Sequence, residues 1–253
     1  MKTLSIANQK GGVGKSTLTV HLAYAAMDAG HRVLLIDMDN QGSLSLTFPP
    51  SPGAAPGRVA SSLFDKQAAG DGVPEAINEK LSIIRADNGL LSVDKHGNGS
   101  IRLPRIALRR FSGDYGLCLI DTPPLLGIRL IAALAASDSV VTPVSVGLYE
   151  LAGVAKLMET IQVVRAQGYN PGLRHLGIIP MKTNTRNTHE KRAMAALRER
   201  YGDAILPESL PERAAVKNAV AMRNPVWFRT RGAGHLLAAK EWRAACASII
   251  GRL

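Results

Sequence analysis

The fold is decided by the stretch Ala7-Asn8-Gln9-Lys10-Gly11-Gly12-Val13-Gly14-Lys15-Ser16-Thr17. A short apolar run, Leu4-Ser5-Ile6, precedes it, and residues 17–29 have the pattern of a helix. A strand, a glycine-rich loop and a helix in this order form a phosphate-binding loop, because loop N–H groups and the positive end of the helix face the same anion. The stretch therefore predicts a site for phosphate groups.

Each residue type in this loop has a chemical role. The glycines let backbone N–H groups converge on phosphate oxygens, Lys15 reaches the β- and γ-phosphates, and the Ser16 hydroxyl is a Mg²⁺ ligand. The usual motif has a glycine five residues before Gly14, where this chain has Gln9, and a second lysine, Lys10, follows. A glycine-rich turn without a ligand is the alternative, and the attached Gly-Lys-Ser-Thr disfavours it.

Two predicted strands end in acidic residues. Residues 32–37 form an apolar run that ends at Asp37, with Asp39 just beyond it, and residues 115–121 form another that ends at Asp121. Ligands of open α/β sheets bind at the carboxyl ends of the strands, so these acids are expected near the phosphate loop. Asp121 is suited to hold a Mg²⁺-bound water there.

The rest of the chain alternates between strand-like and helix-like segments. Strands are predicted at residues 81–85, 139–143, 175–180 and 204–207, helices within 59–77 and at 101–111, 151–167, 188–201 and 236–253, and loops at 48–57 and 87–100. This order predicts an α/β fold, a mostly parallel twisted sheet with helices on both faces, in a single domain over residues 1–253.

Composition excludes several classes of protein. No run approaches the ~20 consecutive apolar residues of a membrane span, and the first strand begins without a signal-peptide pattern. The two cysteines, Cys118 and Cys246, lie far apart in apolar or helical contexts, so we expect both to be reduced. These features predict a cytoplasmic protein.

Positive charge is concentrated in the second half of the chain. The formal net charge is +11, and residues 156–253 hold 17 Lys and Arg against 7 Asp and Glu. A basic half favours a polyanionic partner, most simply nucleic acid. A solvated arginine-rich surface without a partner is the alternative.

Together these motifs resemble the ParA/MinD family of deviant Walker-type ATPases. Residues 10–16 match the family's phosphate loop with its extra lysine, residues 37–42 resemble its Asp-x-Asp-Pro-Gln-Gly segment, and residues 120–124 resemble its second acidic motif. The similarity extends to Gly177-Ile178-Ile179-Pro180 and Asn224-Pro225-Val226-Trp227. The chain looks most like the small plasmid-partition ParA proteins, which lack an N-terminal helix-turn-helix domain.

The resemblance implies ATP or ADP and Mg²⁺ as cofactors, an ATP-dependent homodimer, and slow hydrolysis of ATP to ADP and phosphate. The implied catalytic residues are Lys10, which reaches the other subunit's ATP, Lys15, and Asp39, which orients the attacking water. Ser16 and Asp121 would hold Mg²⁺. The implied nucleotide-binding residues are Gly11, Gly12, Val13, Gly14, Lys15, Ser16 and Thr17, with Met181, Lys182, Pro207 and Glu208 around adenine.

Two positions depart from the family pattern. Asn40 replaces the usual proline of the Asp39 segment, which we expect to loosen it. Gly147 stands where the family often has a glutamate, so a ribose or cross-dimer contact made by that acid is in doubt.

The resemblance and the charge together favour a DNA-partition ATPase. The dimer would bind nonspecific DNA, and a centromere-binding ParB-like partner would trigger hydrolysis and release from the nucleoid. The candidate DNA contacts are Arg186, Arg192, Arg198, Arg200, Arg213, Lys217 and Arg223.

Three alternatives to this function are considered, of which the metal-cluster reductase is set aside. A MinD-like membrane-positioning ATPase would need a free amphipathic C-terminal helix, and the bland Ala244-Ala245-Cys246-Ala247 favours a packed one without stable membrane association. A metal-cluster reductase would need a bridging cysteine pair, which Cys118 and Cys246 do not provide. A small-molecule ligase or kinase of the same fold is the third alternative.

Overall fold

The computed structural model describes residues 1–50, 53, 55–66, 72–146, 150–183 and 187–253. Its described strands form one eight-stranded sheet in the order β3-β4-β2-β5-β1-β6-β7-β8, with β3 antiparallel to β4 and the other neighbours parallel. The strands are β1 (Lys2–Ile6), β2 (Val33–Asp37), β3 (Glu75–Asn78), β4 (Leu81–Ile84), β5 (Leu117–Asp121), β6 (Ser139–Ser145), β7 (Arg174–Thr183) and β8 (Leu210–Pro211).

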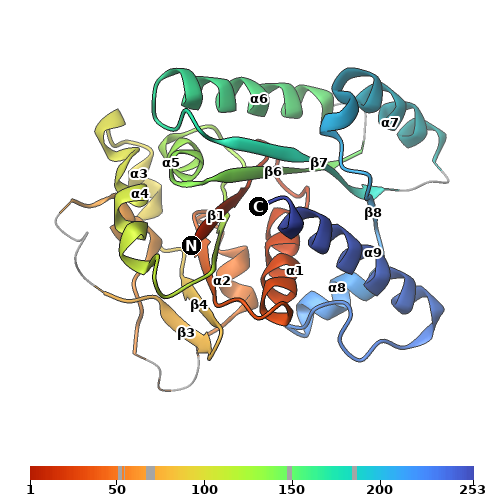
Figure 1. The fold of residues 1–253 in the computed structure, drawn as a ribbon, viewed down its shortest axis with the longest axis horizontal. Coiled ribbons are helices and arrows are strands. Elements are labelled where there is room, and N and C mark those ends of the chain that lie inside the picture. The colour runs from red at the N-terminus through yellow and green to blue at the C-terminus, as the bar shows by residue number, and fades with distance from the viewer. Residues whose placement is uncertain (51–52, 54, 67–71, 147–149, 184–186) are drawn as a thin grey trace.

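Helices cover both faces of this sheet, as the sequence predicts. Figure 1 shows α6 on one side of β6 and β7, with α1 and α9 on the other. The described helices are α1 (Lys15–Asp28), α2 (Ser43–Thr47), α3 (Leu90–Val93), α4 (Leu103–Leu108), α5 (Ile128–Ala136), α6 (Glu150–Ala166), α7 (Thr188–Tyr201), α8 (Ala214–Ala221) and α9 (Gly232–Gly251).

Strands β2 and β5 are apolar up to their final aspartate because both of their faces are buried. Along β2, Val33 and Leu35 pack in the core shared with α1 and α9, whereas Leu34 and Ile36 pack in the core shared with α4 and α5. Successive side chains of a strand point to opposite faces, so a strand between two helical layers needs an apolar residue at every position.

Four predicted segments differ from the structure. Where the structure describes residues 59–77, namely 59–66 and 72–77, they form a 3₁₀ helix, Ala60–Phe64, and the start of the edge strand β3, and no α-helix. The helix predicted at 101–111 is split into α4 and a 3₁₀ turn, and the loop predicted at 87–100 contains the short α3. The strand predicted at 204–207 is also wrong, because Ile205 makes only an isolated bridge to Ile178 and the sheet continues at Leu210–Pro211.

Both cysteines are buried free thiols, which agrees with the predicted reduced state. None of the helices in the described ranges combines the length and hydrophobicity that a bilayer crossing needs.

Candidate nucleotide-binding site

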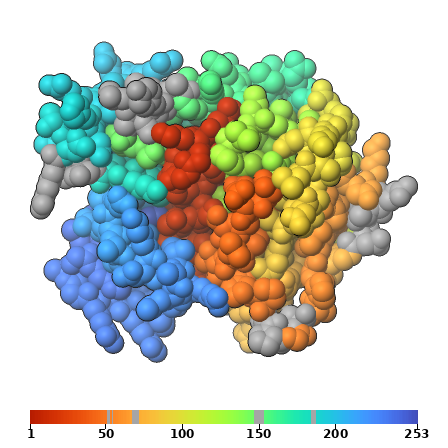
Figure 2. All heavy atoms as spheres, turned by 180° about the vertical axis from the view of Figure 1, so that it is seen from behind, coloured from red at the N-terminus to blue at the C-terminus, as the bar shows by residue number. Residues whose placement is uncertain are grey.

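The glycine loop lies at the carboxyl edge of the sheet, where the strand order reverses around β1. Strand β1 lies between β5 and β6, and the connection from β1 to β2 passes over β5. Such a reversal opens a crevice at the carboxyl ends of the strands. In Figure 2 the N-terminal residues, in red, reach the surface between cyan and blue C-terminal segments and orange and yellow segments.

The loop has the backbone conformation that its glycines allow. Gly12 and Gly14 have φ values of 72° and 100°, in the left-handed region that favours glycine. A Cβ on Gly14 would also lie 2.8 Å from Cε of Met181. Helix α1 begins at Lys15 with no side-chain hydrogen bond at its N-cap, which leaves its first N–H groups for a ligand.

Two polar residues before the glycines anchor the loop. Asn8 Nδ2 donates to the carbonyl oxygen of Pro143 at 2.7 Å, and Gln9 Nε2 donates to Thr160 Oγ1 at 2.7 Å. The residue that replaces the usual glycine, Gln9, therefore ties the loop to α6.

A cavity of about 280 Å³ opens at this loop. We call it the phosphate cavity; its walls are Gly11, Gly12, Gly14, Lys15, Ser16, Thr17, Asp39, Ser43, Pro124 and Lys182. Lys15 Nζ donates to the carbonyl oxygen of Lys10 at 3.1 Å, and Lys182 Nζ donates to that of Gly12 at 2.6 Å. Both ammonium groups thus lie against the loop, and among the described residues neither has a carboxylate as its hydrogen-bond partner.

Ser16 and Asp121 meet at the floor of the site. Ser16 Oγ donates to Asp121 Oδ2 at 2.5 Å, and the buried Oδ1 of Asp121 has no hydrogen-bond partner within the described part of the chain. A hydroxyl beside a carboxylate with an unused buried oxygen is a donor set that fits Mg²⁺ and its waters.

Burial perturbs the charged groups of this site. It raises the pKa of Asp121, and the nearby charge of Asp37 raises it further. Burial also lowers the pKa of Lys15, while Asp121 and Asp39 partly oppose this. A cation at Asp121 would stabilise its ionised form, so the site favours binding of a positive ion.

The two acids after β2 have different surroundings. Asp37 is buried, and its carboxylate accepts from Ser45 N at 2.8 Å, Ser45 Oγ at 2.7 Å and Asp39 N at 3.2 Å. Its pKa is raised to about 6, mainly by burial. Asp37 therefore holds the loop and α2, whereas Asp39 lines the phosphate cavity and accepts from Gln41 N at 3.1 Å.

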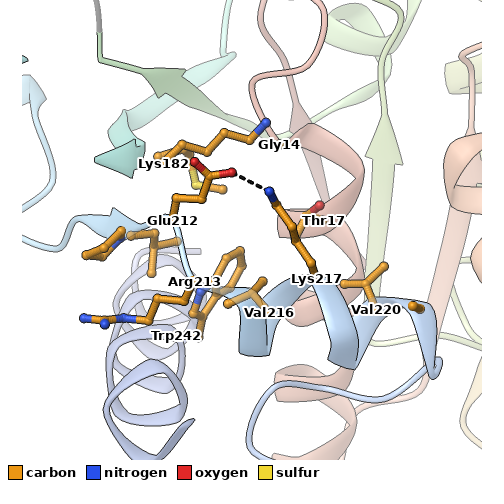
Figure 3. Close-up of a pocket in the computed structure, with 13 residues that line it drawn as sticks. Gly14, Thr17, Lys182, Glu212, Arg213, Val216, Lys217, Val220 and Trp242 are labelled. Carbon is orange, nitrogen blue, oxygen red and sulfur yellow. Dashed lines mark ion pairs between the residues drawn. The ribbon is translucent and has the colours of Figure 1, made fainter. Parts of the chain in front are cut away.

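A second cavity, of about 380 Å³, adjoins the phosphate cavity (Figure 3). We call it the apolar cavity; its walls are Gly14, Thr17, Met181, Lys182, Leu210, Pro211, Glu212, Arg213, Val216, Lys217, Val220, Ala221 and Trp242. Most of these side chains are apolar, as a planar ring such as a nucleobase requires.

Part of the predicted adenine site lines the apolar cavity. Met181 and Lys182 are in its wall, whereas Pro207 and Glu208 are not; Pro211, at the end of β8, and Glu212 and Arg213 beyond it are. Helix α8 and Trp242 also form this wall and were not among the predicted residues, because nothing in the sequence of residues 214–221 indicates a ligand. The strand expected at residues 204–207 lies instead at Leu210–Pro211, so the segment that follows it in the wall begins further along the chain.

The predicted DNA contacts lie in different environments. Arg192, Arg198 and Arg200 are exposed on α7, and Arg223 is exposed after α8. Arg213 is paired with Glu241 at 2.6 Å, and Lys217 with Glu212 at 2.6 Å, both at the apolar cavity (Figure 3 shows the second pair). Arg186 lies outside the described residues, as does Gly147.

Comparison with known proteins identifies relatives of this chain. Residues 1–175 match a family model described as an AAA domain. Protein IncC of Escherichia coli is 36% identical over 233 residues, which cover 90% of this chain and 63% of IncC, so the chain spans less than two thirds of that relative. The chromosome partitioning protein ParA of Caulobacter vibrioides is 34% identical over 238 residues, covering 89% of this chain and 86% of ParA.

A solved structure has the same architecture. Cobyrinic acid a,c-diamide synthase from Mycobacterium smegmatis, with bound ADP and magnesium, superposes with a TM-score of 0.77 at 26% identity, covering 99% of this chain and 94% of that chain. The fold is that of a P-loop nucleotide-binding protein. With the family model and the relatives above, the chain belongs to the ParA family of ATPases.

Proposed function

We propose that this protein is a DNA-partition ATPase that binds ATP, dimerises on it, and is released from DNA by hydrolysis. The observation that carries the proposal is that Lys15, Ser16 and Asp39 line one cavity, with Asp121 bonded to Ser16, and that an apolar cavity adjoins it. The partition role is supported by the similarity to ParA and IncC.

Each of the two cavities binds a different part of the nucleotide. The phosphates lie in the phosphate cavity against the loop N–H groups and Lys15, and the adenine lies in the apolar cavity between Met181 and Val216. Ser16 and Asp121 would hold Mg²⁺, and the ion would supply positive charge that neutralises the phosphates.

Hydrolysis needs a positioned water and a cation near the developing charge. Asp39 is the acid in the phosphate cavity placed to orient the water, since Asp37 is used by Ser45 and the loop. Lys10 has an exposed side chain and is not part of the cavity wall, which suits a lysine that acts on the other subunit's ATP. Hydrolysis then depends on dimerisation.

The DNA surface is centred on α7 and the segment after α8. Arg192, Arg198, Arg200 and Arg223 are exposed, whereas the ion pairs of Arg213 and Lys217 assign these two to the wall of the apolar cavity. Residues 213–240 contain no acidic residue, and Arg229 and Arg231 on this segment are exposed cations that the sequence prediction left out. A surface of this kind binds phosphate backbones without sequence preference.

The partner that triggers hydrolysis is a centromere-binding ParB-like protein, and the ATP-bound dimer is held on the nucleoid. The membrane-positioning alternative is disfavoured by α9, because Trp242, Cys246 and Ile249 are buried in the main core and are not available to a bilayer.

Size-exclusion chromatography and DNA binding test the proposal together. Asp39→Ala, which should bind ATP without hydrolysing it, is expected to form a dimer with ATP and to be retained on nonspecific DNA in a salt-sensitive manner. ADP, or Lys15→Ala with ATP, should give neither. Retention that is absent with ATP, or equal with ADP and ATP, would contradict the proposal.

A second candidate function is ATP-dependent amide synthesis on a small molecule, favoured only by the likeness to the diamide synthase. This function would be indicated by a rate of ATP hydrolysis that increases when an organic acid and an amide donor are added and does not change when DNA is added. The exposed arginines of α7 favour the partition role.

A further inference from the structure

Arg129, on the first turn of α5, is a charged residue that is only 5% exposed. Its guanidinium donates to Asp94 Oδ2 from Nε at 2.9 Å, and Nη2 lies 2.8 Å from the same oxygen. Arginine is seldom buried without partners, because desolvating its charge is costly. The partners of Arg129 therefore indicate which groups its buried guanidinium holds in place.

Asp94 fixes both the backbone and the side chain of Arg129. Its Oδ1 accepts from the backbone N–H of Arg129 at 3.2 Å, which caps the start of α5 from another segment. Gly127 makes room for this carboxylate, because a Cβ there would lie 2.5 Å from Asp94 Oδ1. The guanidinium is thus held in one place before it meets its remaining partners.

Those remaining partners flank Asp39. Arg129 Nη1 donates to Asn40 Oδ1 at 3.1 Å and to the carbonyl oxygen of Met38 at 3.4 Å. The segment between them carries Asp39, which faces the phosphate cavity. One guanidinium therefore holds the residue before and the residue after the acid assigned to the attacking water.

We propose that Arg129, acting through Asn40, is a positioning residue that sets the Asp39 carboxylate for ATP hydrolysis. The inference rests on the proposed ATPase function and deepens it. Positioning matters here because phosphoryl transfer is catalysed mainly by placement, and small displacements of a reacting group are costly. Asp94 is a second member of this arrangement, since it orients the guanidinium.

A purely structural role is the competing explanation, in which Arg129 and Asp94 only stabilise the start of α5. Asn40 separates the two explanations. Removing its carboxamide leaves the Arg129–Asp94 pair, the cap of α5 and the 3.4 Å bond to the Met38 carbonyl in place, and breaks only the bond of Arg129 to the residue after Asp39.

The test compares Asn40→Ala, Asn40→Asp and Arg129→Met with Arg165→Met in the full chain. Arg165 is a distant control, because this exposed arginine of α6 donates to the carbonyl oxygen of Leu173 and, among the described residues, makes no hydrogen bond to the Asp39 segment. Asn40→Ala should lower kcat about 10-fold or more, with KM for ATP within about twofold of wild type and an unchanged melting temperature. Asn40→Asp keeps an acceptor and should retain most of the activity.

A second measurement does not depend on activity. Hydrogen exchange in the nucleotide-free protein should be faster at the Gln41 and Gly42 amides in Asn40→Ala and Arg129→Met, and unchanged in Arg165→Met, since both amides are bonded to Asp39. Wild-type kcat in Asn40→Ala would overturn the proposal. If the wild type hydrolyses no ATP, the proposed function fails instead, and wild-type exchange rates in Asn40→Ala would then overturn the positioning role.

Discussion

The phosphate cavity and the apolar cavity share Gly14, Thr17 and Lys182 in their walls, yet they are built from different kinds of sequence. Most of the phosphate cavity comes from one loop and from residues just beyond β2 and β5, two strands whose last residues, Asp37 and Asp121, are paired in register. The apolar cavity comes from β7, β8, α8 and α9, which are distant in the chain. The first is determined by local motifs and the second by long-range packing.

The largest expected effect is a loss of ATP hydrolysis in a variant that leaves the walls of both cavities unchanged. Lys10→Ala should lower stimulated ATP hydrolysis by about 10³-fold, because a cation supplied across a dimer interface contributes that much in related phosphoryl transfers. ATP binding should be largely retained, since Lys15 and the loop N–H groups are unchanged. Hydrolysis rates and equilibrium binding of a fluorescent ATP analogue measure the two effects. Normal stimulated turnover would show that Lys10 is only a loop lysine.

The same contrast explains how much the sequence could predict. The phosphate loop and Asp39 were predictable because residues within a few positions of each other create their chemistry. Strand β8 was not, because Leu210–Pro211 is a strand only by its pairing with Met181 and Thr183 of β7. The contact of Arg129 with Asn40 joins residues 89 positions apart, and no local pattern indicates it.

A smaller effect concerns the apolar cavity alone. Trp242→Ala removes a side chain that is 2% exposed and packs in the main core, and should lower the free energy of unfolding by about 3–4 kcal/mol. Trp242→Phe is the matched control, because Nε1 of Trp242 has no hydrogen-bond partner in the described ranges. Chemical denaturation measures both. ATP affinity should fall in Trp242→Ala, and an unchanged affinity would remove Trp242 from the nucleotide site.

His21 contacts residues of both cavities, and its protonation makes the stability of the protein depend on pH. On α1, its Nδ1 lies 2.8 Å from the carbonyl oxygen of Thr17, and its Nε2 accepts from Val226 N at 3.2 Å. Its ring also lies 4.2 Å from that of Trp242, measured between centroids. Burial lowers its pKa to about 4, so the folded protein keeps this histidine neutral.

The sign of the pH effect follows from this depressed pKa. Above pH 6.5 both the folded and the unfolded states are neutral at His21, and as the pH falls toward 4 only the unfolded state gains the proton. The free energy of unfolding should therefore fall by up to about 3 kcal/mol over this range. Asp37, whose pKa is raised to about 6, contributes with the opposite sign. The difference in pH dependence between wild type and His21→Gln isolates the histidine, and equal slopes would contradict its assignment.

The smallest expected effect tests whether the cations of α8 belong to the cavity wall or to the DNA surface. Lys217 and Glu212 form an ion pair whose side chains are 70% and 53% exposed, so Lys217→Ala should change stability by no more than about 0.5 kcal/mol. On α7, Arg198→Ala removes an exposed cation that should contact DNA directly.

The two variants should therefore differ in the salt dependence of DNA binding. Arg198→Ala is expected to reduce the slope of log K against log salt by about 1, because one phosphate contact is lost. Lys217→Ala should leave this slope unchanged, because Lys217 is already paired with Glu212. If both variants reduce the slope equally, the DNA surface must include α8 up to the rim of the apolar cavity. Nucleotide and DNA would then compete for Lys217.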